Sequence, residues 1–256
     1  TYTEKGFRGN DKEWESMCIP FGEDAKICLN GVIDRVDLCS LPGEELIKII
    51  DYKSSDSQDL LLAKVYYGLQ MQLLTYLEAA KEMVEKEHKG KEAVPAAMLY
   101  YAIKEKNLDW KPESEEEYEK RVLDSMKCKG YVNEEPEIIG HLDKSVVNGG
   151  ELIPGQKSGV VPVAVDKKGL LKKNSGALST KDFETLIAHT KEKMKECGKA
   201  ILDGKIEAIP YVYEDNDGCT YCPYGSVCGH ESKKDGVREM KKMSDDEVWE
   251  ALYGDD

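Results

Sequence analysis

The sequence has no long apolar run, no excess of basic residues and no N-terminal secretion signal. A transmembrane helix needs about 18 or more consecutive apolar residues, so none is expected. The first residues, Thr1-Tyr2-Thr3-Glu4-Lys5, contain neither an initial methionine nor an apolar segment, which indicates a fragment of a longer protein without a secretion signal. A Gly-rich phosphate loop ending in Gly-Lys-Ser/Thr is also missing, so no ATP site is expected.

Acidic residues outnumber basic ones, and 50 Asp and Glu against 36 Lys and Arg leave a net charge of −14 over 256 residues. Proteins that coat nucleic acid through counterion release carry basic surfaces, so this class is not indicated. If the chain acts on DNA, a partner must supply much of the positive charge. The hydrophobic fraction of 40% is enough for a globular core. The length fits one large domain or two small ones.

Apolar patterning predicts a mixed α/β chain. Strands are predicted at 26–38, 46–52 and 94–103, the first two forming a hairpin around Pro42-Gly43. Helices are predicted at 59–87, 113–126, 179–203 and 245–253, the third opened by a capping-box pattern at Ser179. The Gly- and Lys-rich stretch 145–178 is predicted to be a flexible loop or weak hairpin, and 1–20 shows no clear period. We therefore expect a flank at 1–25, an α/β core at 26–205, and a cysteine module with a charged tail at 206–256.

The predicted hairpin carries carboxylates where apolar residues would be expected. Alternation along the first strand puts Asp34 on the face of Val36 and puts Ile33 on the other face. Asp51 and Lys53 are two residues apart, so they project together from the second strand. A carboxylate on an otherwise apolar face is costly unless it binds something. The hairpin can therefore gather Asp34, Asp51 and Lys53 at one place.

Two carboxylates and a lysine are suited to metal-assisted phosphodiester cleavage. Asp34, Asp51 and the backbone carbonyl of Tyr52 supply the oxygen ligands that Mg²⁺ prefers. The metal can polarise a phosphoryl oxygen and activate a water, while Lys53 holds that water or the developing charge. The simpler alternative is a surface hairpin with a salt bridge between Asp51 and Lys53.

Three motifs in order carry a family resemblance: Gly31-Val32-Ile33-Asp34, Ile50-Asp51-Tyr52-Lys53-Ser54 and Gln72-Leu73-Leu74-Thr75-Tyr76. Together they resemble the RecB-type PD-(D/E)xK nucleases. The resemblance implies a restriction-endonuclease-like α/β core and a Mg²⁺-dependent deoxyribonuclease. It also implies a catalytic set of Asp34, Asp51, Lys53, Gln72 and Tyr76. The last two are four residues apart and share a helix face, which in the family packs beside the metal and helps to hold the DNA.

Cys219, Cys222 and Cys228 form a C-x₂-C-x₅-C pattern. Without a secretion signal a disulfide framework is not expected, and clustered cysteines favour a metal site. His230 makes a Cys₃His zinc site one alternative. A [4Fe–4S] cluster normally needs a fourth cysteine. Three unliganded thiols are the remaining alternative.

A nuclease core followed by this cysteine pattern resembles the C-terminal nuclease domain of AddB-type subunits of AddAB helicase–nucleases. The resemblance implies a [4Fe–4S] cluster on Cys219, Cys222 and Cys228, whose fourth cysteine we expect outside this fragment. It implies an exonuclease that degrades the 5′-ended strand during double-strand-break resection for homologous recombination in the bacterial cytoplasm. An AddA-type helicase–nuclease partner would supply the motor and much of the DNA path. We expect the isolated fragment to lack a complete cluster and full activity.

Two other functions are compatible with the same residues. A Cas4-like iron–sulfur nuclease shares the core and cysteine pattern, although the long stretch between 110 and 210 favours the AddB-type resemblance. A non-catalytic DNA-end clamp would use the cysteine module for binding and retain the acids without activity. The lysines of the Gly- and Lys-rich stretch favour a solvated loop over a track for a DNA backbone; they are Lys167, Lys168, Lys172 and Lys173.

Overall fold

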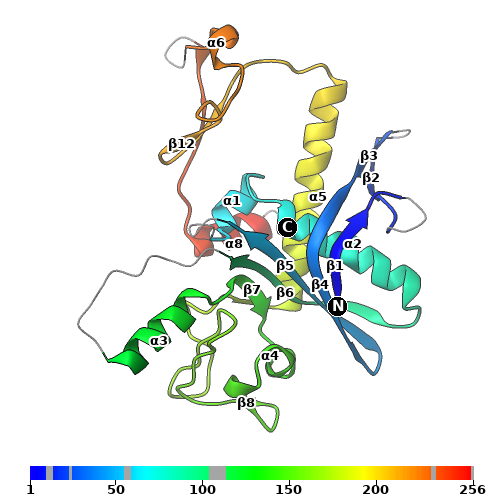
Figure 1. Cartoon of the computed structure of the whole chain (residues 1–256). Coiled ribbons are helices and arrows are strands. Elements are labelled where there is room, and N and C mark those ends of the chain that lie inside the picture. Colours follow the sequence, from blue (N-terminus) through cyan, green and yellow to red (C-terminus); the bar gives the residue numbers. More distant parts are fainter. Residues whose placement is uncertain (10–13, 23–24, 55–58, 104–113, 232–234, 255–256) are drawn as a thin grey trace.

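A mixed six-stranded sheet forms the centre of the computed structural model, which describes residues 1–9, 14–22, 25–54, 59–103, 114–231 and 235–254 (Figure 1). Its strands, in order across the sheet, are β1 (Tyr2–Phe7), β4 (Gly31–Leu41), β5 (Glu44–Lys53), β6 (Glu92–Ala102), β7 (Lys129–Asn133) and β10 (Ala177–Leu178). β5 and β6 are parallel, as are β7 and β10, and the other neighbouring pairs are antiparallel. The predicted α/β class is therefore confirmed.

The predicted hairpin is formed by β4 and β5, and the predicted third strand is β6. Pro42 and Gly43 make the turn, and Gly43 has a φ of 84°, which favours glycine at this position. Residues 1–25, expected to be a flank, contribute β1 to the edge of the sheet. Glu4 has a φ of 48° and interrupts the pairing with β4. For this reason polar and apolar residues do not alternate regularly along β1.

The prediction of one continuous strand over 26–38 is wrong. The segment divides at Asn30 into β3 (Ala25–Leu29) and β4, and β3 pairs instead with β2 (Met17–Phe21). Cys18 and Cys28 lie opposite each other in this second hairpin, with Cα atoms 4.1 Å apart, and form a disulfide. The expectation of cysteines without disulfides is therefore wrong for this pair. The two cysteines are ten residues apart in sequence, and only the register of β2 against β3 brings them together.

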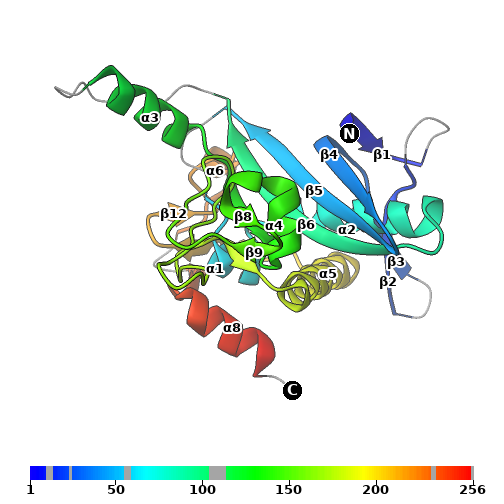
Figure 2. The same ribbon diagram turned by 90° about the horizontal axis from the view of Figure 1, so that it is seen from below.

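Helices α2 (Gln72–Glu87) and α5 (Thr180–Leu202) lie side by side against one face of the sheet (Figure 2). Buried residues of α2 recur every three or four positions, as an amphipathic helix requires; they include Leu73, Leu77, Ala80 and Val84. The predicted capping box of α5 is present, with Ser179 and Asp182 exchanging hydrogen bonds. Ion pairs of Lys81 with Glu184 and of Glu78 with Lys191 join the two helices.

The single helix predicted over 59–87 is also wrong. The structure has a short helix α1 (Leu62–Tyr66), a turn, and then α2. Gly68 in the turn has a φ of 76°, and its backbone N–H bonds to the carbonyl of Val65, so the first helix ends there. The apolar spacing runs through both helices because Val65 and Leu73 enter the same core, and this continuity concealed the break.

The opposite face of the sheet is covered by α4 (Pro136–Leu142) and by the Gly- and Lys-rich stretch. This stretch contains a short 3₁₀ turn at Lys144–Val146 and a weak hairpin of β8 (Val147–Asn148) and β9 (Glu151–Leu152). It is packed rather than open, because Val161, Val163 and Val165 are fully buried. The predicted weak hairpin is therefore confirmed only at 147–152, and flexibility of the stretch 145–178 remains a prediction.

The C-terminal part forms an arm beyond the end of α5 (Figure 1). It comprises β11 (Tyr211–Tyr213), β12 (Asn216–Asp217), α6 (Gly225–Cys228) and β13 (Arg238–Met240), with the three strands in one small sheet. The predicted terminal helix is α8 (Asp245–Tyr253), which returns to the core beside α1. The predicted charged helix is α3 (Glu115–Ser125); its expected first residue, Glu113, lies outside the described residues. Within the described ranges, no helix has the length and apolarity needed to cross a bilayer.

Candidate active site

Asp34 lies where the regular pairing of β4 with β5 stops. The last paired residues are Arg35 and Ile50, so Asp34 is one position beyond them. Ile33 and Val36 are both fully buried in the cluster beneath α2, so the expected placement of Ile33 on the opposite face is wrong. With alternation broken at this point, the Asp34 side chain reaches across to β5. Its Oδ2 atom accepts a hydrogen bond from the backbone N–H of Tyr52 at 2.7 Å.

Asp51 and Lys53 project from the end of β5, as the two-residue spacing predicts. Asp51 is only 3% exposed. The Lys53 Nζ atom lies 2.6 Å from Asp51 Oδ2 and 5.1 Å from the centre of the Tyr100 ring. The lysine is therefore held between a buried carboxylate and an aromatic face, which favours a fixed position for its charge.

The charge on Asp51 is only partly compensated. Burial raises the pKa of its carboxyl above the usual range, the Lys53 ammonium opposes the rise, and the negative charge of Asp34 adds to it. The same carboxylate acts on Tyr100, which pairs with Asp51 across β5 and β6. Burial, followed by the charge of Asp51, raises the pKa of the Tyr100 hydroxyl to about 12. The site thus combines two interacting carboxylates with few neutralising groups.

The helix motif joins this cluster through a chain of hydrogen bonds. Gln72 is the first residue of α2, and its Oε1 accepts a hydrogen bond from Lys53 Nζ at 2.9 Å. Its Nε2 donates to the Tyr76 hydroxyl at 3.0 Å, one helical turn further on. Asp51, Lys53, Gln72 and Tyr76 therefore form one continuous network. Asp34 lies beside this network, held by its hydrogen bond from the backbone N–H of Tyr52.

Two aromatic residues at the site escaped the sequence analysis. Phe7 of β1 packs edge-on against Tyr76, with ring centres 6.0 Å apart. Phe7 also pairs with Gly31, where an added Cβ would approach the Phe7 ring to 2.8 Å. Tyr100 was inside a predicted strand, but only the register places it beneath Lys53. Neither residue belongs to a motif, so no local signal could have identified it.

The three clustered cysteines lie in and just before α6 of the C-terminal arm, and α6 lies away from β4 and β5, which carry the aspartates (Figure 1). Cys219, Cys222 and Cys228 are exposed, and hydrogen bonds to Asp217 shape the start of their loop. Within the part of the chain that the structure describes, no three Cys, His, Asp or Glu side chains gather as a metal site. The imidazole Nδ1 of His230 lies 3.7 Å from Asp235 Oδ2. The described residues thus do not form a complete cluster or zinc site, and both remain predictions.

The mixed sheet with two aspartates and a lysine at the end of its central hairpin has the architecture of a PD-(D/E)xK nuclease core. The sequence model of the PD-(D/E)XK nuclease superfamily matches residues 3–229, and the chain belongs to this family. Part of the B subunit of an ATP-dependent helicase/deoxyribonuclease from Lachnoclostridium phytofermentans is 36% identical over 237 residues, 91% of this chain. Proteins with the same name from Thermoanaerobacter sp. and Clostridium novyi are each 33% identical, over 95% and 97% of the chain.

These relatives are much longer than the present chain, which spans about 20% of the first two and 21% of the third. The chain is therefore a PD-(D/E)XK nuclease domain homologous to the C-terminal part of AddB-type subunits. The family resemblance predicted from the three motifs and the cysteine spacing is confirmed.

Proposed function

We propose that this domain hydrolyses DNA phosphodiester bonds in a Mg²⁺-dependent reaction at Asp34, Asp51 and Lys53. The observation that carries the proposal is the network in which Lys53 contacts both the buried Asp51 and Gln72, with Asp34 anchored beside it. An ordinary surface salt bridge would not need a carboxylate that is 3% exposed.

The residues fit a divalent cation. Asp34 and Asp51 interact unfavourably as anions, and Asp51 has a raised pKa through burial. A cation between them would remove this repulsion, with water completing its oxygen ligands. Asp34, Asp51 and the backbone carbonyl of Tyr52 are the proposed ligands. When bound, Mg²⁺ would polarise a phosphoryl oxygen and lower the pKa of an attacking water.

The other residues position groups around the phosphate. Lys53 offers a fixed positive charge to the water or to the extra negative charge that develops on the phosphoryl oxygens. Gln72 holds Lys53 through its carbonyl oxygen and is itself tied to Tyr76. The uncharged Tyr100 ring shields one side of the lysine, so its ammonium has few alternative positions.

For the whole protein we propose the AddB-type component of a bacterial helicase–nuclease that acts in the cytoplasm. The names of the relatives support a role beside a helicase. In that role, we propose that this domain degrades the 5′-ended strand during resection for homologous recombination. An AddA-type partner would unwind the duplex with ATP and feed a single strand to this site. Cys219, Cys222 and Cys228 are proposed to hold a [4Fe–4S] cluster together with a cysteine outside this chain, and zinc is the alternative metal.

The test compares wild type, Asp51→Asn and Lys53→Ala in the full-length protein with its partner, on a duplex labelled at each end. We expect Mg²⁺-dependent cutting of the 5′-ended strand to fall by at least about 10²-fold in both variants while unwinding continues. Glu44→Gln is the matched control, because Glu44 is an exposed acid at the other end of the same strand. Unchanged cutting by the Asp51 and Lys53 variants would favour a non-catalytic DNA-end clamp instead.

A further inference from the structure

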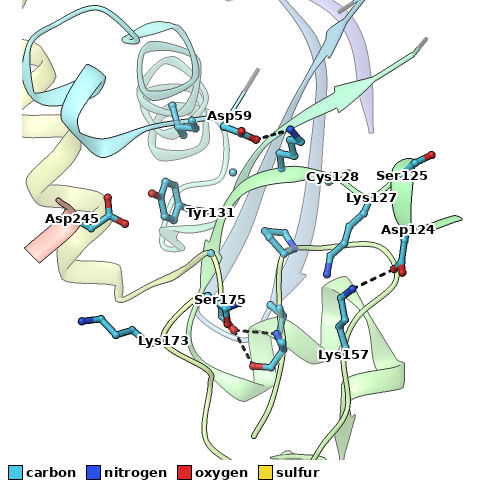
Figure 3. A pocket seen from close by; sticks show the side chains of 18 residues that line it. Asp59, Asp124, Ser125, Lys127, Cys128, Tyr131, Lys157, Lys173, Ser175 and Asp245 are labelled. Atoms are coloured by element: carbon cyan, nitrogen blue, oxygen red, sulfur yellow. Dashed lines mark hydrogen bonds and ion pairs between the residues drawn. The ribbon is translucent and has the colours of Figure 1, made fainter. Parts of the chain in front are cut away.

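A cleft of about 460 Å³ lies at the start of β7 (Figure 3). Four lysines line it: Lys127, Lys129, Lys157 and Lys173. Three aspartates, Asp59, Asp124 and Asp245, also contribute. The ionisable side chains of this lining therefore carry a formal charge of about +1. The lining is therefore less acidic than the chain as a whole, which has a net charge of −14.

The sheet register connects the cleft directly to the catalytic aspartate. Asp51 of β5 pairs with Tyr100 of β6, and Tyr100 pairs with Lys129 of β7. Residues paired across neighbouring strands project from the same face of a sheet. Neighbouring strands lie about 4.8 Å apart, so the backbone of Lys129 is about 10 Å from that of Asp51. This distance is short enough for one DNA strand to contact both positions.

The charge inside the cleft is incompletely paired. Lys129 binds Asp59 at 2.6 Å, Lys157 binds Asp124 at 3.3 Å, and Lys173 binds Asp246, just outside the lining, at 2.9 Å, which leaves Lys127 as the lining lysine for which no ion pair is found among the described residues. Lys127 donates to the backbone carbonyl of Ser158 at 2.8 Å. Burial lowers the pKa of the Lys127 ammonium, and the neighbouring positive charge of Lys157 adds to the effect. An ammonium has three donor hydrogens, so Lys127 has capacity for an anionic ligand.

Figure 3 shows where these groups stand. Lys127 and Lys157 lie on one side of the cleft, and Lys173 and Asp245 lie on the other. Hydroxyl groups of Ser125 and Ser175 also line it, and each donates its hydrogen to a backbone carbonyl, of Val122 and Ala164 respectively. Of the four lysines that the sequence analysis considered as a DNA track, only Lys173 belongs to the lining.

We propose that this cleft binds the phosphate backbone of the substrate strand close to the bond that is cut. The proposal rests on the proposed nuclease function and extends it with a positioning subsite formed by Lys127, Lys129 and Lys157. A strand running from the catalytic network toward Lys129 would place one phosphate at the network and a later one among these amines. Lysines in the cleft would bind phosphates and so fix the position of the strand relative to the active site without contacting the bases.

The test measures binding of the 256-residue chain to a fluorescent single-stranded oligonucleotide at several KCl concentrations, with EDTA to prevent cleavage. Each lost phosphate contact on a single strand reduces the slope of log K against log salt by about 0.7. We expect Lys127→Gln and Lys129→Gln each to reduce the slope by that amount, and the triple variant with Lys157→Gln to reduce it by about 2. Lys167→Gln, an exposed lysine of the same loop region outside the lining, is expected to keep the wild-type slope.

Lys127→Arg separates charge from folding, because it keeps the positive charge and is expected to keep the wild-type slope. Wild-type slopes in all three cleft variants, or no salt-dependent binding by the wild-type chain, would overturn the subsite. Asp51→Asn is measured in parallel for cleavage in the full-length protein. If cutting survives that change while the cleft variants lose their slope, the proposed function fails and the binding site stands. If cutting is lost and the slopes of the cleft variants are unchanged, the proposed function stands and the binding site fails.

Discussion

The ammonium of Lys53 donates a hydrogen bond to Oε1 of Gln72 at 2.9 Å, and this contact joins the strand motif to the helix motif. The same ammonium lies 2.6 Å from Asp51, so its position is fixed from two directions. Gln72 also donates to Tyr76, which packs against Phe7 of the edge strand. The lysine is thus linked through two residues to the first strand of the chain.

If Gln72 positions Lys53, Gln72→Ala is expected to slow single-turnover cleavage by about tenfold, the equivalent of one hydrogen bond of about 1.4 kcal/mol. Lys53→Ala removes the charge itself and is expected to cost about 10²–10³-fold. Tyr76→Phe, which removes only the far end of the hydrogen-bond chain, should cost less than Gln72→Ala. A Gln72→Ala rate equal to wild type, or a change in DNA affinity alone, would contradict a positioning role.

Gly31 is predicted to protect the same network by its lack of a side chain. A Cβ at this position would meet two Phe7 ring atoms at 2.8 Å, and Phe7 is 1% exposed and cannot move outward freely. Gly31→Ala is therefore expected to destabilise the fold by about 1–3 kcal/mol and to displace Tyr76. The combination Gly31→Ala with Phe7→Leu relieves the contact and should recover part of the stability, as measured by urea unfolding. An additive loss in the double variant would show that the two residues do not interact.

Much of the candidate site could be predicted because its residues are local in sequence. The Asp51–Lys53 spacing fixes a shared strand face, and the Gln72–Tyr76 spacing fixes a shared helix face. The contact between Lys53 and Gln72 depends instead on how α2 packs on β5, which no local pattern contains. The placement of Tyr100 depends on the register of a parallel strand pair for the same reason.

The errors in the fold also have physical causes. The helix break at Gly68 was hidden because apolar residues on both sides of it enter one core. The disulfide between Cys18 and Cys28 was missed because β2 was not predicted, so its partner strand had no known register. Edge strand β1 contains Glu4 at a positive φ, and this irregularity removed the alternation that predicts strands.

Asp51 is predicted to favour function at the expense of stability in the metal-free protein. Its folded pKa is raised above the ordinary value of 3.8, so ionisation costs more in the folded state than in the unfolded state. The destabilisation is absent below pH 3.8 and appears as the pH rises through the folded pKa. Asp51→Asn is therefore expected to raise the melting temperature at pH 7 by about 2 °C or more in EDTA. At about pH 3.5 wild type and Asp51→Asn should have the same melting temperature. A lower melting temperature for the variant at pH 7 would contradict the argument.

Glu45, at the other end of β5, is predicted to stabilise the fold when it is ionised, whereas ionised Asp51 destabilises it. Its side chain is 2% exposed, and its carboxylate contacts Lys91 at 2.9 Å, His88 at 3.1 Å and the Ser40 hydroxyl at 2.6 Å. Burial opposes its ionisation, but hydrogen bonds from Ser40, Lys91 and His88 outweigh this effect and lower the pKa below the ordinary value of 4.5. The ionised group therefore contributes stability above pH 4.5 that is lost as the pH falls through the lower folded pKa.

Glu45→Gln is accordingly expected to cost about 2–3 kcal/mol at neutral pH, because it leaves buried donors without their charged partner. The difference from wild type should shrink as the pH is lowered below 4.5, which thermal unfolding at a series of pH values would measure. Glu44→Gln is the matched control, since this neighbouring acid is exposed and its removal should change stability little. Because Glu45 lies at the opposite end of the strand from Asp51, cleavage at low temperature should keep its wild-type pH dependence in Glu45→Gln. A shift of that profile would mean that the two ends of β5 are coupled.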